Sequence, residues 1–186
     1  MDIFEACRLG DIATLATAIN SGANINQVRN DFIQTPLEQA CISDNYECAK
    51  YLLYLNANVT DRALTCCNDY EVQNILISRG ANPNAKGDCG TTLLHIACDE
   101  ESDPERVRYL LQHGADPNVV DDLGCTPLYL AAYDNPEIVQ LLLHAGANPN
   151  FARTDDGETP LARARRIATS NPEKYRTREV VQLLSN

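Results

Sequence analysis

The sequence lacks any apolar run long enough to form a membrane-spanning helix. We also expect no secretory signal, because the residues from Met1 to Glu5 are acidic and show no basic-then-apolar pattern. Basic residues are scarce: 15 Lys and Arg against 26 Asp and Glu give a formal net charge of −11. Nucleic-acid binding needs basic side chains to neutralise phosphates, so no nucleic-acid partner is expected. We expect a folded cytoplasmic protein that contacts no membrane; export into a host cell stays open, although no export signal is visible.

Disulfide and zinc motifs are also missing, although the sequence contains eight cysteines. None of them forms Cys-x-x-Cys, and no histidine lies at zinc-site spacing from a cysteine pair. We interpret the cysteines as small apolar residues of a reduced protein, with no metal and no cofactor. Cys89 and Cys125 stand beside Gly90 and Gly124, where we expect them to be exposed.

What the sequence does have is three short phrases that recur in a fixed order. The first is a turn ending in Asn or Asp, with spacings of 34, 24, 34 and 32 residues: Gly22-Ala23-Asn24, Asn56-Ala57-Asn58, Gly80-Ala81-Asn82, Gly114-Ala115-Asp116 and Gly146-Ala147-Asn148. The second precedes this turn: Leu52-Leu53, Leu76-Ile77, Leu110-Leu111 and Leu141-Leu142-Leu143. The third opens the segments: Thr35-Pro36-Leu37, Thr92-Leu93-Leu94, Thr126-Pro127-Leu128 and Thr159-Pro160-Leu161. Such an order predicts tandem structural repeats.

Each phrase has a local physical reason. Threonine before proline supplies a helix N-cap oxygen, and proline has no N–H to leave unpaired in the first helical turn. Leucine followed by small residues three and four positions later gives a short helix a narrow apolar face. The leucine pair carries a second helix, which glycine ends. Neither short helix is stable alone, so neighbouring repeats must supply the core.

These phrases resemble the ankyrin repeat, whose consensus runs Asp-x-x-Gly-x-Thr-Pro-Leu-His-x-Ala-Ala, then Glu-Val-Val-x-Leu-Leu-Leu and Gly-Ala-Asp. The closest copy runs from Asp121 to Asn150. The resemblance implies an all-α solenoid of helix-turn-helix units with short hairpin loops, forming a single domain over residues 1–186. It divides the chain into six repeats, with the first and last as caps, at approximately 1–30, 31–60, 61–86, 87–119, 120–152 and 153–186.

The third repeat is shorter than the others. The distance from the turn phrase to the next opening leucine is 14 residues after Gly80 but only 8 after Asn56. This difference indicates that six residues are missing from the hairpin and helix entry. The distance from the opening leucine to the glutamate of the second helix is 10 residues after Leu37 but 7 after Leu64. This difference places three more missing residues in the first helix or its loop. We predict that one hairpin is absent between the second and third repeats, and that Asp61 caps the shortened helix. The gap is either a tolerated deletion or a notch that receives a partner.

Charge is concentrated in two segments. Residues 1–150 carry a net −13 and residues 151–186 a net +2. The sixth repeat has an eight-residue excess, which we expect to lengthen its first helix and extend the loop beyond it, and this region contains Arg163, Arg165, Arg166, Lys174, Arg176 and Arg178. It is either a solvated cap or a contact for an acidic partner. The acidic segment 99–105 is explained in part by helix entry at Pro104, and a cation-seeking patch is the alternative.

Catalytic motifs are absent: there is no serine elbow, no phosphate-cradling glycine loop and no His-Glu-x-x-His stretch. The resemblance places His95 at a position that hydrogen-bonds neighbouring loops. His113 and His144 stand near helix ends, which suits basic residues. We therefore do not expect an enzyme.

The resemblance implies a monomer that binds another protein along its concave side, through hairpin tips and the exposed faces of the first helices. Exposed apolar side chains would anchor such a partner. The candidate residues at these positions are Phe32, Gln34, Ile42, Lys86, Asp88, Asp99, Glu100, Leu123, Tyr133, Asp134, Phe151 and Arg153. The protein is expected to be a scaffold or adaptor; the alternative is a stoichiometric inhibitor that occludes a partner enzyme.

Overall fold

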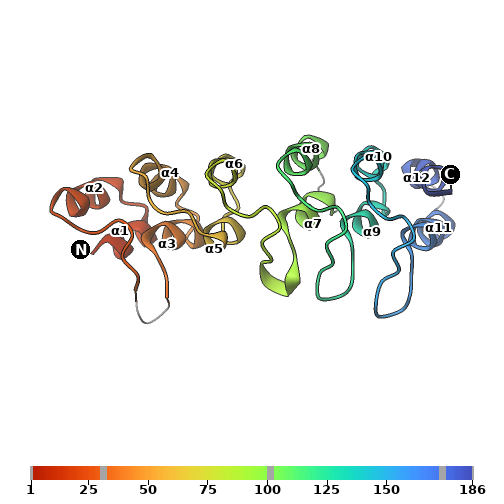
Figure 1. Ribbon diagram of the computed structural model, residues 1–186, viewed down its shortest axis with the longest axis horizontal. Coiled ribbons are helices and arrows are strands. Elements are labelled where there is room, and N and C mark those ends of the chain that lie inside the picture. The colour runs from red at the N-terminus through yellow and green to blue at the C-terminus, as the bar shows by residue number, and fades with distance from the viewer. Residues whose placement is uncertain (1, 30–32, 100–102, 172–174, 186) are drawn as a thin grey trace. The chain divides into compact units, whose positions relative to one another are not determined.

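The computed structural model describes residues 2–29, 33–99, 103–171 and 175–185, and in these ranges it contains helices and no strands (Figure 1). Contacts divide the chain into two compact units, which we call unit 1 (Met1–Ala85) and unit 2 (Lys86–Asn186). Candidates Phe32 and Glu100 lie outside the described residues. No described helix is long and apolar enough to cross a membrane.

Unit 1 consists of three helix pairs: α1 (Ile3–Leu9) with α2 (Ile12–Asn20), α3 (Pro36–Ile42) with α4 (Tyr46–Tyr54), and α5 (Asp61–Thr65) with α6 (Tyr70–Ser78). The first helices α1, α3 and α5 pack in one row, and the second helices α2, α4 and α6 follow beside them. The fully buried large side chains of this unit come from both rows: Ile3, Leu15, Leu37, Leu52, Leu53, Leu64 and Leu76.

Unit 2 also contains three pairs: α7 (Leu93–Cys98) with α8 (Pro104–Gln112), α9 (Pro127–Ala131) with α10 (Pro136–His144), and α11 (Pro160–Ser170) with α12 (Tyr175–Ser185). A single 3-10 turn, η1 (Asp88–Gly90), precedes α7. The row α7, α9 and α11 carries the long loops, and the row α8, α10 and α12 lies on the other side (Figure 1). The core includes Leu94, Leu110, Leu128, Ile138 and Leu142.

The recurring threonines begin the first helices, as predicted. Thr35 caps α3 through its hydroxyl, which accepts from the Glu38 N–H at 3.2 Å, while the Glu38 carboxylate accepts from the Thr35 N–H at 2.9 Å. Thr126 and Thr159 cap α9 and α11 through their hydroxyls and are followed by proline. Since each cap satisfies an N–H that the helix leaves unpaired, it stabilises the helix by about 1 kcal/mol.

The predicted absence of a hairpin between the second and third repeats is confirmed, and the deletion is confined to the hairpin and helix entry. α5 starts after Thr60, only four residues beyond Asn56, whereas Thr126 lies twelve residues beyond Gly114. The N-caps of the first and second helices are nine residues apart in the third repeat (Thr60 and Asp69) and also in the fifth (Thr126 and Asn135). Leu64 is four residues after its cap rather than two, so it does not correspond to the opening leucines. The predicted loss of three residues from the first helix is wrong: relative to the fifth repeat, eight residues are missing, all before Thr60.

Thr60, and not Asp61, caps the shortened helix. Its hydroxyl oxygen accepts from the Ala63 N–H at 3.1 Å and donates to the Glu38 carboxylate at 2.7 Å. The predicted capping role of Asp61 is therefore wrong, because Asp61 is already the first helical residue. Figure 1 shows the resulting short connection between α4 and α5, in contrast to the long loop between α2 and α3.

Asp61 instead holds the next turn in place. Its Oδ1 atom accepts from the Asn82 N–H at 2.8 Å. Where the hairpin is present, an asparagine at its base makes the same bond to the following turn, at the same 2.8 Å: Asn26 to the Asn58 N–H and Asn118 to the Asn148 N–H. The shortened repeat thus keeps the bond between turns and supplies its acceptor from the helix.

Two expectations about charged segments are confirmed. α11 has 11 residues, against 5 in α9, so the excess in the sixth repeat lengthens its first helix. The expected extension of the loop beyond it falls on residues 172–174, which lie outside the described residues. Pro104 is the first residue of α8, and the side chain of Asp103 accepts from the Glu105 N–H at 2.9 Å. The acids of this segment that the structure describes are therefore largely explained by helix entry.

Candidate partner-binding surface

Four loops, here called fingers 1 to 4, precede the first helices α3, α7, α9 and α11. Each is closed across its base by one backbone hydrogen bond of 2.8–3.0 Å. The closing N–H and carbonyl pairs are Arg29 and Gln34 in finger 1, Gly87 and Thr91 in finger 2, Asp121 and Cys125 in finger 3, and Arg153 and Glu158 in finger 4. The second residue before the threonine cap is Ile33, Gly90, Gly124 or Gly157, and its φ is positive in every finger.

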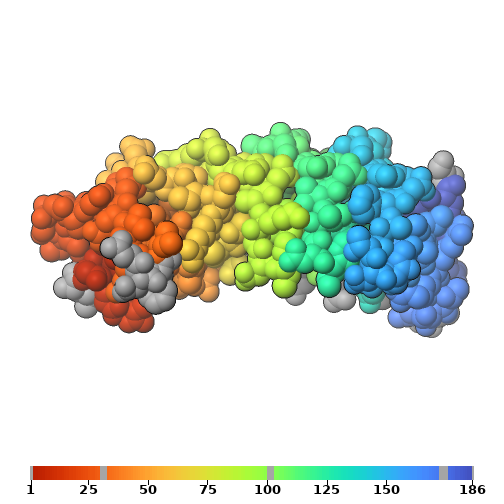
Figure 2. Space-filling model, turned by 60° about the horizontal axis from the view of Figure 1, so that its bottom comes forward, coloured from red at the N-terminus to blue at the C-terminus, as the bar shows by residue number. Residues whose placement is uncertain are grey.

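The fingers of unit 2 pack directly against one another. The Asp122 N–H donates to the Cys89 carbonyl at 3.0 Å. A Cβ atom on Gly90 would lie 2.3 Å from Asp122 Oδ1, and one on Gly124 would lie 2.7 Å from the backbone nitrogen of Thr154. Only glycine allows so close an approach. Figure 2, in which the loop side is turned forward, shows the fingers of this unit abutting from green to blue.

Side chains on the first helices of unit 2 fix the fingers that follow. The buried imidazole of His95 pairs through Nδ1 with the Thr92 cap and through Nε2 with the Cys125 carbonyl at 3.1 Å. Burial lowers the pKa of His95, so the neutral ring is favoured. The Tyr129 hydroxyl donates to the Glu158 carboxylate at 2.7 Å. Fingers and first helices thus form one preorganised surface within this unit.

An arginine and two tyrosines stack at the end of that surface. The Arg163 guanidinium lies 4.4 Å from the ring centroid of Tyr129 and 5.8 Å from that of Tyr133. Its Nε–H is buried and has no hydrogen-bond partner in the described part of the chain. Arg166 bonds Glu158 at 2.7 Å, which lowers the pKa of that carboxyl to about 2. The aromatic faces hold the Arg163 guanidinium in place by cation–π attraction, whereas Arg166 is held by its ion pair with Glu158.

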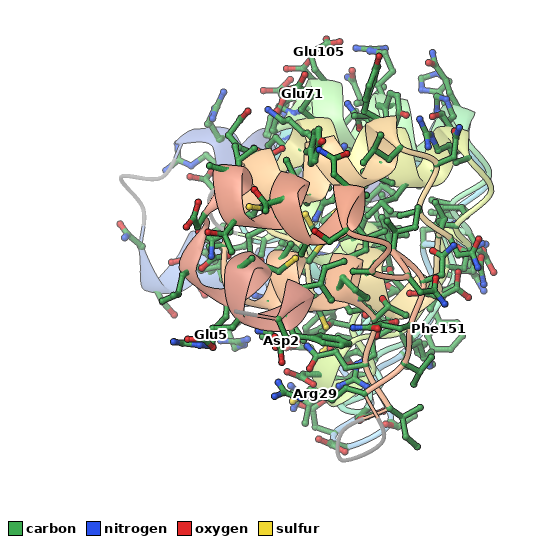
Figure 3. All side chains as sticks on the ribbon, turned by 90° about the vertical axis from the view of Figure 1, so that its left-hand side faces the viewer. Asp2, Glu5, Arg29, Glu71, Glu105 and Phe151 are labelled. Carbon is green, nitrogen blue, oxygen red and sulfur yellow. The ribbon has the colours of Figure 1, made fainter. Side chains whose placement is uncertain are left out.

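Large apolar side chains are exposed on the same row of helices and fingers. Ile96 on α7 exposes 59% of its surface, and Leu123 at the tip of finger 3 exposes 55%. Figure 3 shows the two sides of this unit: Phe151 lies on the finger side, whereas Glu105 lies at the second-helix side. The finger side therefore combines exposed aliphatic side chains with fixed cations.

Comparison with known proteins identifies the architecture. A family model of ankyrin repeats in three copies matches residues 62–153, and one of ankyrin repeats in many copies matches residues 3–53. The chain belongs to the ankyrin repeat family. An ankyrin repeat protein of fowlpox virus (strain NVSL) is 53% identical over 83 residues; the match covers 44% of this chain but only 19% of that protein. The crystal structure of an ankyrin repeat domain (ABAYE2397) from Acinetobacter baumannii AYE matches with a TM-score of 0.77 and 28% identity, covering 98% of this chain and 95% of that one.

The all-α ankyrin-repeat fold class is thereby confirmed. Ankyrin repeats generally mediate protein–protein interactions and are typically non-enzymatic. The cysteines fit this view: those described are free thiols, and burial raises the pKa of Cys7 to about 12. Burial also raises the pKa of Cys48 above its usual value. No group of three His, Cys, Asp or Glu side chains suited to a metal lies within the described ranges.

Five of the predicted partner-binding residues are exposed. They are Ile42 at the end of α3, Lys86 and Asp88 on finger 2, Asp99 at the end of α7, and Leu123 on finger 3. Lys86 also has a structural role, because its Nζ atom donates to the Val120 carbonyl at 2.8 Å and so ties finger 2 to finger 3. Tyr133, Phe151 and Arg153 are half-buried. As partner contacts, all of these residues remain predictions.

Two candidates have their side chains engaged within the fold. Gln34 is only 6% exposed, so its expected exposure on a hairpin is wrong: it lies at the base of finger 1, opposite Arg29. Asp134 is half-buried, and its carboxylate accepts from the Thr177 hydroxyl at 3.2 Å, which ties the α9–α10 turn to α12. The expected exposure of Cys125 is also wrong, because its side chain is buried; Cys89 is exposed, as predicted.

The candidate set omits five exposed aliphatic residues, of which Ile33 and Ile96 are the most exposed; the others are Leu9, Ile12 and Val28. Ile96 occupies the variable position after the consensus histidine, on the solvent face of a short helix. The signal for Ile33 was its place two residues before the cap Thr35, where the other fingers have glycine. His95, His113 and His144 have the predicted structural roles: the Nδ1 atoms of the last two pair with carbonyls one turn earlier.

Proposed function

We propose that this chain is a scaffold or adaptor, and that unit 2 binds a partner protein across fingers 2 to 4 and the exposed side of α7, α9 and α11. The observation that carries the proposal is the exposure of Ile96 and Leu123 on a surface whose fingers are locked together. Aliphatic side chains on a rigid frame lose little conformational freedom on binding, so their burial favours a complex.

The electrostatics support one orientation of the partner. The tyrosine rings on which Arg163 stacks hold its guanidinium in place. A preorganised guanidinium pairs well with carboxylates. The partner is therefore expected to place aliphatic or aromatic side chains on Ile96 and Leu123 and acidic side chains near α11.

Affinity capture from lysate, followed by titration of the purified partner, tests the proposal. Leu123→Ala and Ile96→Ala should each weaken binding by about tenfold, the loss expected when a buried anchor is truncated. Gln112→Ala, an exposed position on α8, is the matched control on the opposite row. Equal affinity of wild type and both apolar variants would exclude this surface.

An activity assay of the same complex distinguishes a scaffold from an inhibitor. If the captured partner is an enzyme, its activity is measured with saturating wild-type chain and with Leu123→Ala at the same concentration. Unchanged activity on binding indicates a scaffold, whereas a stoichiometric loss that Leu123→Ala fails to reproduce indicates an inhibitor.

A further inference from the structure

Finger 1 departs from the other fingers at one position. Ile33 occupies the place of Gly90, Gly124 and Gly157, two residues before the threonine cap. Its φ of +47° lies in the same left-handed region as the +69° to +73° of these glycines. A β-branched residue seldom adopts this region, because its Cβ atom crowds the backbone. Ile33 is nevertheless 77% exposed, the most exposed of the large aliphatic side chains described.

The glycines show which way a side chain at this position points. At Gly90 the Cβ atom would run into Asp122 of the next finger, and at Gly124 into Thr154 of the next finger. At Gly157, which ends the series, nothing lies within 4 Å. A side chain here therefore points into the space where the following finger packs. The repeat directly after finger 1, which begins with α5, has no finger, because the deletion before Thr60 removes it.

The space left by the deletion is bordered by well-fixed groups of unit 1. The Asn58 N–H is bound to Asn26 at the base of finger 1, and Arg62 Nη1 donates to the Ile33 carbonyl at 3.3 Å. The shortened connection is hollowed: a depression of about 550 Å³ is lined by residues 56–60 and Arg79. We call the space left by the deletion, which Ile33, Asn58 and Arg62 border, the notch.

We propose that the notch receives an extended segment of a partner protein that places an apolar side chain against Ile33. The equivalent space in unit 2 shows what kind of occupant fits, because a polypeptide loop fills it there and donates the Asp122 N–H to the Cys89 carbonyl. The notch cannot take a finger of the same kind, since the isoleucine side chain stands where Asp122 would pack. An apolar side chain both fills the remaining space and covers Ile33.

Panning random linear peptides displayed on phage against the full chain tests the proposal. Enriched peptides are synthesised and titrated by calorimetry against wild type and Ile33→Gly. The peptides should share an aliphatic or aromatic residue and bind Ile33→Gly about tenfold more weakly. Ile33→Gly removes the left-handed strain, so its thermal midpoint should equal or exceed that of the wild type, and lost binding will not reflect unfolding. Leu9→Ala, an exposed aliphatic position on α1, should bind as the wild type does.

A second variant restores the finger. Replacing Val59 by residues 117–125 gives the third repeat the spacing of the fifth, and adding Ile33→Gly lets the new finger pack. This variant should fold and should bind none of the selected peptides. The proposal is overturned if no peptide is enriched on wild type over Ile33→Gly, or if the peptides bind wild type, Ile33→Gly and the restored variant equally. Because Leu123 and Ile96 lie on unit 2, this proposal and the proposed function can fail separately.

Discussion

Adding one methyl group to Gly124 and to Gly157 separates two reasons for glycine in the fingers. Both residues have φ values near +70°, so alanine at either position carries the strain of the left-handed region, about 1–2 kcal/mol. Alanine also reduces the conformational freedom of the unfolded chain, which stabilises the folded protein by about 0.4–1 kcal/mol. Gly157→Ala, with nothing within 4 Å of the new methyl group, should therefore destabilise the protein by about 1 kcal/mol.

Gly124→Ala should cost more, because its methyl group would lie 2.2 Å from Thr154 Oγ1 and 2.7 Å from the Thr154 backbone nitrogen. A backbone atom cannot rotate away, so finger 4 must shift; overpacking of this kind costs about 1–3 kcal/mol. The expected total is about 2–4 kcal/mol. Urea denaturation followed by circular dichroism compares the two variants with the wild type. Equal losses of stability for Gly124→Ala and Gly157→Ala would refute the tight packing of finger 3 on finger 4.

Two further predictions concern the polar contacts that hold adjacent repeats together. Asp61→Ala should lower the free energy of unfolding by about 0.5–1.5 kcal/mol, because the Asn82 N–H loses its acceptor. Asp61→Asn keeps the oxygen and should restore stability in thermal denaturation; an asparagine variant as unstable as the alanine variant would contradict the assigned bond. Glu158 has its pKa lowered from 4.5 to about 2, chiefly by Arg166, so its contribution is present above pH 4.5 and is lost as the pH falls toward 2. The exposed Arg166 limits this contribution to about 1 kcal/mol, and Glu158→Gln should flatten the stability profile in that range; identical wild-type and variant profiles would count against the ion pair.

The helix pairs could be predicted from the sequence because their signals are local. A threonine such as Thr35 or Thr126 caps the helix that follows it, and the leucines two residues later repeat with the helix. The missing hairpin could also be predicted, since the spacing of the turn phrases measures chain length directly. The prediction misplaces three of the missing residues because it equates Leu64 with the opening leucines, although the cap Thr60 lies four residues before Leu64. The cap is the better reference, since its hydrogen bond defines where the helix starts.

The surface residues could be predicted less well, because exposure depends on contacts between distant parts of the chain. Gln34 is at a hairpin position but is buried, and Asp134 is at a turn but binds Thr177, which is 43 residues away. The stacking of Arg163 against Tyr129 and Tyr133 depends in the same way on how α11 packs against α9. The sequence indicates that these arginines are basic and clustered, but only the packed helices show which ring each one covers.

Glycine in a finger meets two separate requirements, a left-handed backbone and room for the next finger, and Ile33 shows that the two are independent. Gly90 and Gly124 satisfy both the left-handed backbone and the close approach of the next finger, whereas Gly157 has only the backbone to satisfy. At Ile33 the next finger is missing, so no close approach has to be accommodated, but the left-handed backbone remains. The absence of a neighbour therefore permits isoleucine without favouring it, and its strain of about 1–2 kcal/mol is not offset by burial within the described part of unit 1, since the side chain is 77% exposed. Burial against a partner is the one gain that this position still offers, and for that reason the notch is the place to test for a second binding site.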